Sequence, residues 1–275
     1  MKRMPWSTNQ LKRLSRQIRD GGPAQPGVPT YRDVMLWYND LAESVQSRIA
    51  RLDWTPLLGN RSFEITSRPK TIDTLRQKLR REPSTPLPSV QDVAGVRFEA
   101  EMTLDEQDAV VTAIAGVFGH PEHECVRDLR DRPHSGYRAV HLWLRLDARV
   151  EVQVRTHLQG AWANMYEVAA DVFGREIRYD ELPRSPQDRD IVDALQKLST
   201  SRVARIERNR NEIASLVLTL DELHEHSVTQ EDYQSVRRRV ELLRQQNLAN
   251  EQKLRGDLDR LREVFRQESA PGGGS

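Results

Sequence analysis

Three polar residues suited to anion and metal chemistry alternate with valines over residues 150–156, Val-Glu-Val-Gln-Val-Arg-Thr. Strict alternation is the period of a β-strand with one buried face, so the valines are expected to face a core. Glu151, Gln153 and Arg155 then line the opposite face. A carboxylate, an amide and a guanidinium in one row suit a sheet that binds an anion with a metal ion, but an ordinary solvent-exposed face has the same pattern.

A second group of residues is cationic. Arg68 and Lys70 precede a predicted helix over residues 71–81, whose N-terminus attracts anions, and Lys78 lies two turns further on. Such a group can cradle a polyphosphate. The alternative is a solvated basic helix.

Asp92 stands just ahead of a predicted strand over residues 93–100. If this strand neighbours the one at 150–156, Asp92 and Glu151 can share Mg²⁺, a hard cation that prefers oxygen ligands and retains phosphate oxygens in its shell. The alternative role for Asp92 is that of a cap or turn residue.

Residues 127–141 hold a glycine, a flat ring and an imidazole at close spacing. Gly136 lets the backbone pass close to a ligand, and Tyr137 offers a ring for a base. His141 shares the face of Tyr137 if the following strand already begins there, because four residues is an even number. Packing for Tyr137 and structural hydrogen bonding for His141 are the alternatives.

Composition sets limits on the class of protein. The 275 residues carry a net charge of only +1, which indicates no partner by itself, but residues 66–90 and 126–155 are each locally basic. Cys125 is the only cysteine, which excludes an internal disulfide and a cysteine-based zinc site and favours a reducing compartment. No apolar run suits a signal peptide or a membrane span, so we expect a soluble, cytoplasmic protein without a membrane partner.

The elements that must position these residues form an α+β pattern. Residues 60–180 are expected to run strand–helix–strand–helix–strand–strand–helix, which predicts a mixed β-sheet flanked by helices. Strands are expected at 63–66, 93–100, 139–146 and 150–156, with a charged loop at 119–135. Helices are expected at 8–20, 31–52, 71–81, 104–118 and 158–173.

Four regions follow from this pattern: N-terminal helices (1–60), the α+β domain (61–182), a C-terminal helical hairpin or coiled coil (187–268) and a flexible tail (269–275). The C-terminal region is charged and poor in glycine and proline, with helices expected at 191–224 and 229–267. Its second helix has an apolar seam at heptad spacing that continues after a shift of phase. The seam comprises Tyr233, Val236, Val240, Leu243, Asn247, Asn250 and Leu254, then Leu258, Leu261 and Phe265.

The order and internal spacing of four blocks resemble the synthetase domain of the RelA/SpoT alarmone synthetases over residues 63–173. The blocks are Arg68-x-Lys70-x₇-Lys78, Asp92-x₄-Arg97, Gly136-Tyr137-x₃-His141 and Glu151-x-Gln153-x-Arg155-Thr156. No counterpart of the hydrolase or regulatory domains of the long family members is present. The chain is therefore similar to a small, single-domain member with added helices, and the resemblance implies a nucleotidyltransferase-like fold.

The resemblance also implies roles for individual residues. Arg68 and Arg97 would sandwich the adenine of ATP, and Lys70 and Lys78 would hold its phosphates. On the catalytic side, Asp92 and Glu151 would bind Mg²⁺, with Glu151 also the base for the attacking hydroxyl. The acceptor would be bound by Tyr137, which stacks on its base, by His141 with Arg127 or Arg132 at its phosphates, and by Gln153 and Arg155.

Two departures from the family pattern lie on the acceptor side. The family commonly has Pro-Lys-x-Asn-Gly-Tyr where this chain has Pro133-His-Ser-Gly-Tyr137. The helix after the opening strand carries Trp162-Ala163, closer to small synthetases than to long enzymes. The donor residues are therefore assigned more firmly than the acceptor residues.

Three functions remain open at this stage. The first is an ATP-dependent pyrophosphokinase that makes guanosine alarmones (ppGpp or pppGpp) from GDP or GTP and releases AMP. The second is a toxin-type pyrophosphokinase that modifies the 3′ end of tRNA, with an antitoxin or self-association through the C-terminal helices. The third is a non-enzymatic coiled-coil scaffold with a degenerate nucleotide-binding domain, against which the two carboxylates, Asp92 and Glu151, argue.

Overall fold

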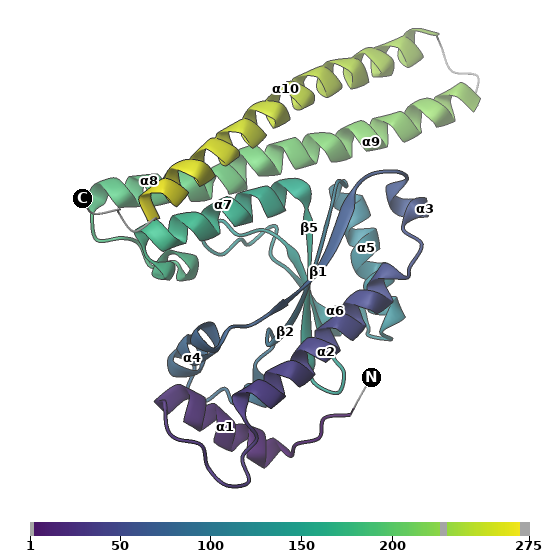
Figure 1. The fold of residues 1–275 in the computed structure, drawn as a ribbon. Helices are drawn as coiled ribbons and strands as arrows, with labels where there is room; N and C mark the ends of the chain where they lie inside the picture. The colour runs from purple at the N-terminus through teal and green to yellow at the C-terminus, as the bar shows by residue number, and fades with distance from the viewer. Residues whose placement is uncertain (1–2, 226–229, 270–275) are drawn as a thin grey trace. The chain divides into compact units, whose positions relative to one another are not determined.

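The computed structural model of the protein describes residues 3–225 and 230–269 (Figure 1). Its contacts divide the chain into two compact units. Unit 1 comprises Met1–Ala100, Ala109–Asp128 and Val140–Val154, and unit 2 comprises Glu101–Asp108, Leu129–Ala139 and Arg155–Ser275. Apart from Ser269, the expected tail lies outside the described residues.

Unit 1 is built on a sheet with strand order β1-β2-β5-β4-β3. The strands are β1 (Phe63–Pro69), β2 (Ala94–Ala100), β3 (Val126–Asp128), β4 (Val140–Arg145) and β5 (Arg149–Thr156), whose last two residues belong to unit 2. β1 pairs with β2, β4 with β5 and β3 with β4, all antiparallel. The α+β fold with a mixed sheet is confirmed, as is the expected position of β2 beside β5.

The helices described in unit 1 are α1 (Thr8–Asp20), α2 (Tyr31–Ala50), α3 (Thr55–Leu58), α4 (Ile72–Arg81), the turn η1 (Leu87–Ser89), most of α5 (Leu104–Val117) and α6 (Glu122–Cys125). Among them, α1, α2 and α4 begin at a residue whose side chain caps the helix. Ser7 and Gln10 form a capping box at α1, and Gly21 ends it in a left-handed conformation. Thr30 and Thr71 cap α2 and α4 in the same way, through a side chain that accepts from a backbone amide.

One face of the sheet is buried and the other is polar. Val150, Val152 and Val154 are fully buried, as the alternation predicts, and α2 packs against β1 and β2. The opposite face of the sheet carries the charged and amide side chains. This division confirms that the polar row of β5 occupies its own face.

The loop expected over residues 119–135 is not entirely irregular. It contains α6 and the short strand β3, which adds an edge to the sheet by pairing Arg127 with His141. A three-residue strand is too short to produce a recognisable alternation, which is why the sequence pattern missed it.

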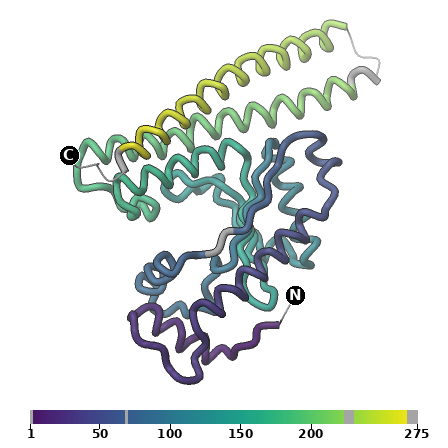
Figure 2. Tube along the Cα trace, viewed as in Figure 1, coloured from purple at the N-terminus to yellow at the C-terminus, as the bar shows by residue number. Residues whose placement is uncertain are grey.

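Unit 2 is mainly helical (Figure 2). It contains α7 (His157–Phe173), η2 (Arg175–Tyr179), α8 (Pro186–Lys197), the π-helical segment η3 (Leu198–Val203), α9 (Ala204–Glu225) and α10 (Gln230–Ser269). α9 and α10 run side by side as a hairpin, as expected. No helix of the described residues has the length and apolar character needed to cross a membrane.

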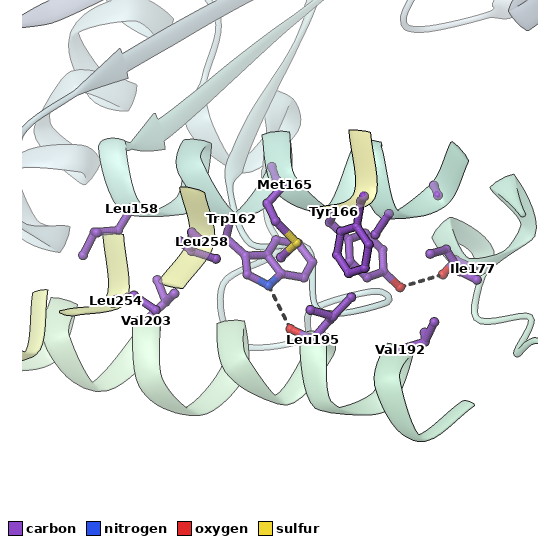
Figure 3. Packing of buried hydrophobic residues seen from close by; sticks show 14 of the residues in the cluster. Leu158, Trp162, Met165, Tyr166, Ile177, Val192, Leu195, Val203, Leu254 and Leu258 are labelled. Carbon is purple, nitrogen blue, oxygen red and sulfur yellow. Dashed lines mark hydrogen bonds between the residues drawn. The ribbon is translucent and has the colours of Figure 1, made fainter. Parts of the chain in front are cut away.

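The core of unit 2 gathers around Trp162 of α7 (Figure 3). Its indole nitrogen donates to the carbonyl of Leu195 at 2.8 Å, and its ring stacks on Tyr166 with centroids 4.7 Å apart. Leu254 and Leu258 of α10 pack into the same cluster. Burial of these side chains therefore attaches α10 to α7 as well as to α9.

The seam of α10 shifts phase earlier than predicted. Asn247 is buried, but Asn250 is exposed and Glu251 takes the buried position. The buried positions 247, 251, 254 and 258 then follow heptad spacing, because 247 and 254 are seven residues apart and so are 251 and 258. Glu251 is tolerated there because Arg210 and Arg255 both bind its carboxylate. The expectation for Asn250 is therefore wrong.

Candidate functional site

The densest group of charged residues in unit 1 surrounds Asp92. Lys70 follows β1, Lys78 lies on α4, and Asp92 lies two residues before the start of β2. Leu75 and Leu79 bury one side of α4, and Lys78, three residues after Leu75, lies at the edge of that side. The Nζ atom of Lys70 lies 2.5 Å from Oδ2 of Asp92, and that of Lys78 lies 2.9 Å from Oδ1.

This arrangement favours the charged forms of Asp92 and Lys78. Burial by itself raises the pKa of Asp92, but the two ammonium groups outweigh it and lower the pKa to about 2. Burial lowers the pKa of Lys78, but the charge of Asp92 and its hydrogen bond raise it above the ordinary value. Two lysines are thus held in fixed positions beside a shared carboxylate.

A second group is centred on Glu151, which is only 8% exposed. His141 and Trp143 of β4 stand opposite Gln153 and Glu151 of β5 in the antiparallel register. Nδ1 of His141 lies 3.2 Å from Oε1 of Glu151, and the indole nitrogen of Trp143 donates to the same oxygen at 3.3 Å. The amide nitrogen of Gln153 donates to Oε2 at 2.8 Å.

These contacts keep Glu151 ionised. Burial raises the pKa of its carboxyl group, but the hydrogen bond and charge of His141, with the amide of Gln153, hold it below the ordinary value. The charge of Asp92 acts in the opposite direction on the same group, so the two carboxylates lie within electrostatic range. The strand order agrees, since Gln91 donates to the carbonyl of Val150 at 3.0 Å.

The remaining donor residues flank these groups. Arg97 of β2 lies 3.4 Å from Oε1 of Glu99 on the same strand, and its backbone pairs with Thr66. The backbone of Arg68 pairs with Gly95 one pleat further along, but the side chain of Arg68 lies outside the described part of the chain.

Arg127 extends the polar face to the edge strand β3. Its guanidinium lies 4.8 Å from the centroid of the Trp143 ring. Sequence reasoning missed Trp143, although its place two residues after His141 puts it on the same face of β4. Trp143 is 37% exposed, so part of its ring surface is accessible on this polar face.

Tyr137 and Arg155 form a separate group in unit 2. Nη2 of Arg155 donates to the Tyr137 hydroxyl at 2.6 Å. Tyr137 precedes β4 and lies in a turn closed by a bridge to His134, so the strand does not yet include Tyr137 and the condition for a face shared with His141 is not met. Arg132 is exposed in the same loop.

Gly136 has a different role from the one expected. Its φ is +79°, and a Cβ there would meet the backbone Cα of Gln196 at 2.9 Å and the Trp162 ring at 3.0 Å. The side of Gly136 that a Cβ would occupy is thus in close contact with α7 and α8.

The turn before Tyr137 is held by a residue that the sequence did not suggest. Ser135 and Asp180 both have positive φ, at 50° and 59°. The Asp180 carboxylate accepts from the amide and hydroxyl of Ser135, and the Asp180 amide donates back to that hydroxyl. The reciprocal hydrogen bonds therefore hold two residues in a costly backbone conformation and fix the shape of this turn.

The chemistry of these donors suits a hard divalent cation. Within the described residues no three His, Cys, Asp or Glu side chains gather as a metal site. Two ionised carboxylates in electrostatic range suit Mg²⁺, which is commonly held by one or two carboxylates together with substrate phosphates. An ionised carboxylate also retains lone pairs beyond those already used in hydrogen bonds.

Comparison with known proteins assigns the family. Residues 67–175 match the family described as the region found in RelA / SpoT proteins. Uncharacterized proteins from Mycobacterium tuberculosis and Mycobacterium bovis are 48% identical over 197 residues, which cover 71% of this chain and 70% of each relative. The chain therefore belongs to the RelA/SpoT family and contains a RelA/SpoT synthetase-like domain.

Solved structures share the fold at low sequence identity. The small alarmone synthetase 1 from Bacillus subtilis matches with a TM-score of 0.51 and 22% identity over 69% of this chain and 98% of that chain. The same protein bound to its product pppGpp matches with 0.50 and 20% over 68% and 98%. A GTP pyrophosphokinase family protein from Streptococcus pneumoniae matches with 0.50 and 17% over 68% and 94%.

Proposed function

We propose that the protein is an ATP-dependent nucleotide 3′-pyrophosphokinase. It transfers the β,γ-pyrophosphate of ATP to the ribose 3′-hydroxyl of GDP or GTP and releases AMP. The observation that carries this proposal is the pair of lysines on Asp92, within electrostatic range of the ionised Glu151. Family membership supports the reaction class, and the relative bound to its product pppGpp supports a guanosine acceptor.

The transfer needs a base and charge neutralisation. The acceptor 3′-oxygen forms a bond to the β-phosphorus of ATP, the bond from that phosphorus to the oxygen of the α-phosphate breaks, and AMP leaves with this oxygen. Glu151 accepts the hydroxyl proton, for which its lowered pKa keeps it ready at neutral pH. Lys70 and Lys78 exchange part of their contact with Asp92 for the phosphates of ATP.

Electrostatic balance supports a bound Mg²⁺. The charges of the two lysines and the two carboxylates cancel one another, so these four groups alone offer the triphosphate no net positive charge. Mg²⁺ held by Asp92 and Glu151 would supply Lewis-acid stabilisation of the phosphate oxygens. His141 and Gln153 fix the orientation of Glu151 from the neighbouring positions.

The other residues complete the substrate contacts in this proposal. Arg68 and Arg97 contact the adenine, and Tyr137 stacks on the acceptor base. Arg127, Arg132 and Arg155 supply cationic groups for acceptor phosphates, together with His141.

Incubation with ATP labelled at the γ-phosphate tests the proposal. GDP, GTP and bulk tRNA are offered as separate acceptors, and the products are separated by chromatography. Label in a guanosine product, with AMP released in equal amount, is the expected result. Label only in tRNA would instead establish the toxin-type reaction, and no transfer to any acceptor would favour the nucleotide-binding scaffold.

A further inference from the structure

A pocket of about 430 Å³ lies in unit 1 between α1, α4 and the segment that leads into η1. In Figure 1, α1 and α4 lie side by side, as their contacts require. The residues that line the pocket are Lys12, Ser15, Arg16, Arg19, Leu79, Pro83, Ser84, Thr85, Pro86 and Ser89. The reaction proposed above uses none of them.

The charge of this pocket is one-sided. Three lining residues are cationic and none is acidic. Lys12, Arg16 and Arg19 are spaced at i, i+4 and i+7, so they share one face of α1. Arg19 forms an ion pair with the neighbouring Asp20, and the charge of Arg16 also acts on that carboxylate. Within the described residues, neither Lys12 nor Arg16 has a side-chain hydrogen bond or a close ion pair.

A second pocket of about 410 Å³ adjoins the same face of α1. It is lined by Asn9, Lys12, Arg13, Arg16 and Gln25, again with no acidic residue. Lys12 and Arg16 belong to both pockets. A ligand that contacts Lys12 and Arg16 from both pockets at once therefore needs more than one anionic group.

The cations are mounted on a helix that is fixed in place. Leu11, Leu14 and Ile18 bury the opposite face of α1, and the hydroxyl of Ser15 accepts from the amide of Leu87 at 2.7 Å. From α4, Arg76 and Arg80 donate to the last carbonyls of α1, at 3.1 and 2.9 Å. A site whose walls are already ordered loses little entropy when a ligand binds.

The remaining lining residues suit a phosphorylated small molecule. The hydroxyls of Ser84, Thr85 and Ser89 can donate to phosphate oxygens, and Leu79, Pro83 and Pro86 offer apolar surface. The volume lies in the range of small-ligand sites. A nucleic-acid strand needs a longer basic track than the eight residues of α1, from Lys12 to Arg19, that carry these cations.

We propose that this face of α1, the Lys12–Arg16 site, binds the phosphates of a nucleoside di- or triphosphate or of an inorganic oligophosphate. The site stands apart from the proposed reaction, because its cations, hydroxyls and apolar residues are different ones. Its existence does not depend on pyrophosphate transfer.

Calorimetric titration with inorganic tripolyphosphate, and separately with GTP, tests the site at low salt without Mg²⁺. The variant K12Q/R16Q changes two exposed side chains, and R244Q/K253Q removes the same charge from exposed positions of α10. We expect K12Q/R16Q to lose one equivalent of bound tripolyphosphate, or to bind it at least tenfold more weakly, while R244Q/K253Q binds as the wild type does.

Hydrogen exchange then locates the binding. We expect tripolyphosphate to protect residues 8–20 and 83–89 in the wild type and not in K12Q/R16Q. If GTP and tripolyphosphate bind with equal affinity, phosphate is the recognised group. If GTP binds more tightly than tripolyphosphate, the site also contacts the nucleoside. Binding unaffected by K12Q/R16Q, weakened equally by R244Q/K253Q, or seen only with an RNA oligonucleotide would overturn the proposal.

The same titration separates this site from the reaction site. If pyrophosphate transfer fails in every assay, the equivalent that depends on Lys12 and Arg16 is still expected. If transfer succeeds and that equivalent is absent, the Lys12–Arg16 site alone is disproved.

Discussion

Nδ1 of His141 lies 3.2 Å from Oε1 of Glu151, across the antiparallel pair of β4 and β5. The residue directly opposite His141 is Gln153, so the contact to Glu151 is a diagonal one on the same face. Gln153 holds the other oxygen of the carboxylate at 2.8 Å. The sheet therefore fixes both oxygens of Glu151 from two strands, as a base or a metal ligand requires.

Glu151→Gln is predicted to abolish transfer while ATP still binds. The amide retains the shape of the side chain but cannot accept the hydroxyl proton, so the rate of transfer should fall at least about 100-fold. Binding of a non-hydrolysable ATP analogue should change by less than about threefold. Single-turnover assays and equilibrium dialysis measure the two quantities.

Glu64→Gln is the matched control for that substitution. Glu64 is an exposed residue of β1, two strands away from β5, and should leave the rate of transfer unchanged. Undiminished turnover in Glu151→Gln would remove Glu151 from the mechanism.

Asp92 is predicted to make the metal-free protein sensitive to acid. Its pKa is about 2 in the folded protein against 3.8 ordinarily, so the unfolded chain binds the proton first as the pH falls. The resulting stabilisation, about 2 kcal/mol, is complete above about pH 5 and is lost as the pH falls through 4 toward 2.

Urea unfolding in EDTA at several pH values between 7 and 2.5 measures this effect. The free energy of unfolding of the wild type should decline more steeply below pH 4 than that of Asp92→Asn, by about 2 kcal/mol in total. If the free energies of unfolding of the two proteins fall equally with pH, the lysines do not lower the pKa of Asp92 in solution.

Local patterns predicted the elements of this fold better than they predicted its site. The alternation over residues 150–156 located β5 and its buried valines, because a period of two is visible within a few residues. It also showed that Glu151 and Gln153 share a face. The alternation could not show that His141 and Trp143 bind Glu151. That contact depends on the register between β4 and β5, which the sequence of one strand does not determine.

Contacts between residues far apart in the chain were the least predictable. Ser135 and Asp180 are 45 residues apart, and both adopt a backbone conformation that neither residue type requires. Gly136 was correctly singled out as a residue that permits close approach. That Gln196 is one of its neighbours depends on how α8 packs in unit 2.

Gly136→Ala is predicted to destabilise unit 2. A φ of +79° is costly for alanine, and its Cβ would lie 2.9 Å from a backbone atom, so we expect a loss of at least about 2 kcal/mol. Gly116→Ala is the control, because Gly116 lies in α5 with open space around its Cβ position and should gain about 0.5–1 kcal/mol. Thermal unfolding followed by circular dichroism compares them, and equal stability of the two variants would contradict the strained turn.

A buried ion pair in unit 2 is predicted to determine its stability. Arg138 is 6% exposed and Glu207 is 2% exposed, with Nη1 and Oε2 2.5 Å apart, and Thr156 donates to the other oxygen of Glu207. Glu207→Ala leaves the Arg138 charge buried without its partner, which should cost about 3–5 kcal/mol. Replacing both partners in R138M/E207L should recover most of that loss, because no uncompensated charge remains.

Urea unfolding measures both effects. The control is Lys197→Gln, which breaks an exposed ion pair and should change the free energy of unfolding by less than about 1 kcal/mol. If Glu207→Ala proves as stable as this control, solvent reaches the pair and Glu207 does not fix α9 to the end of β5.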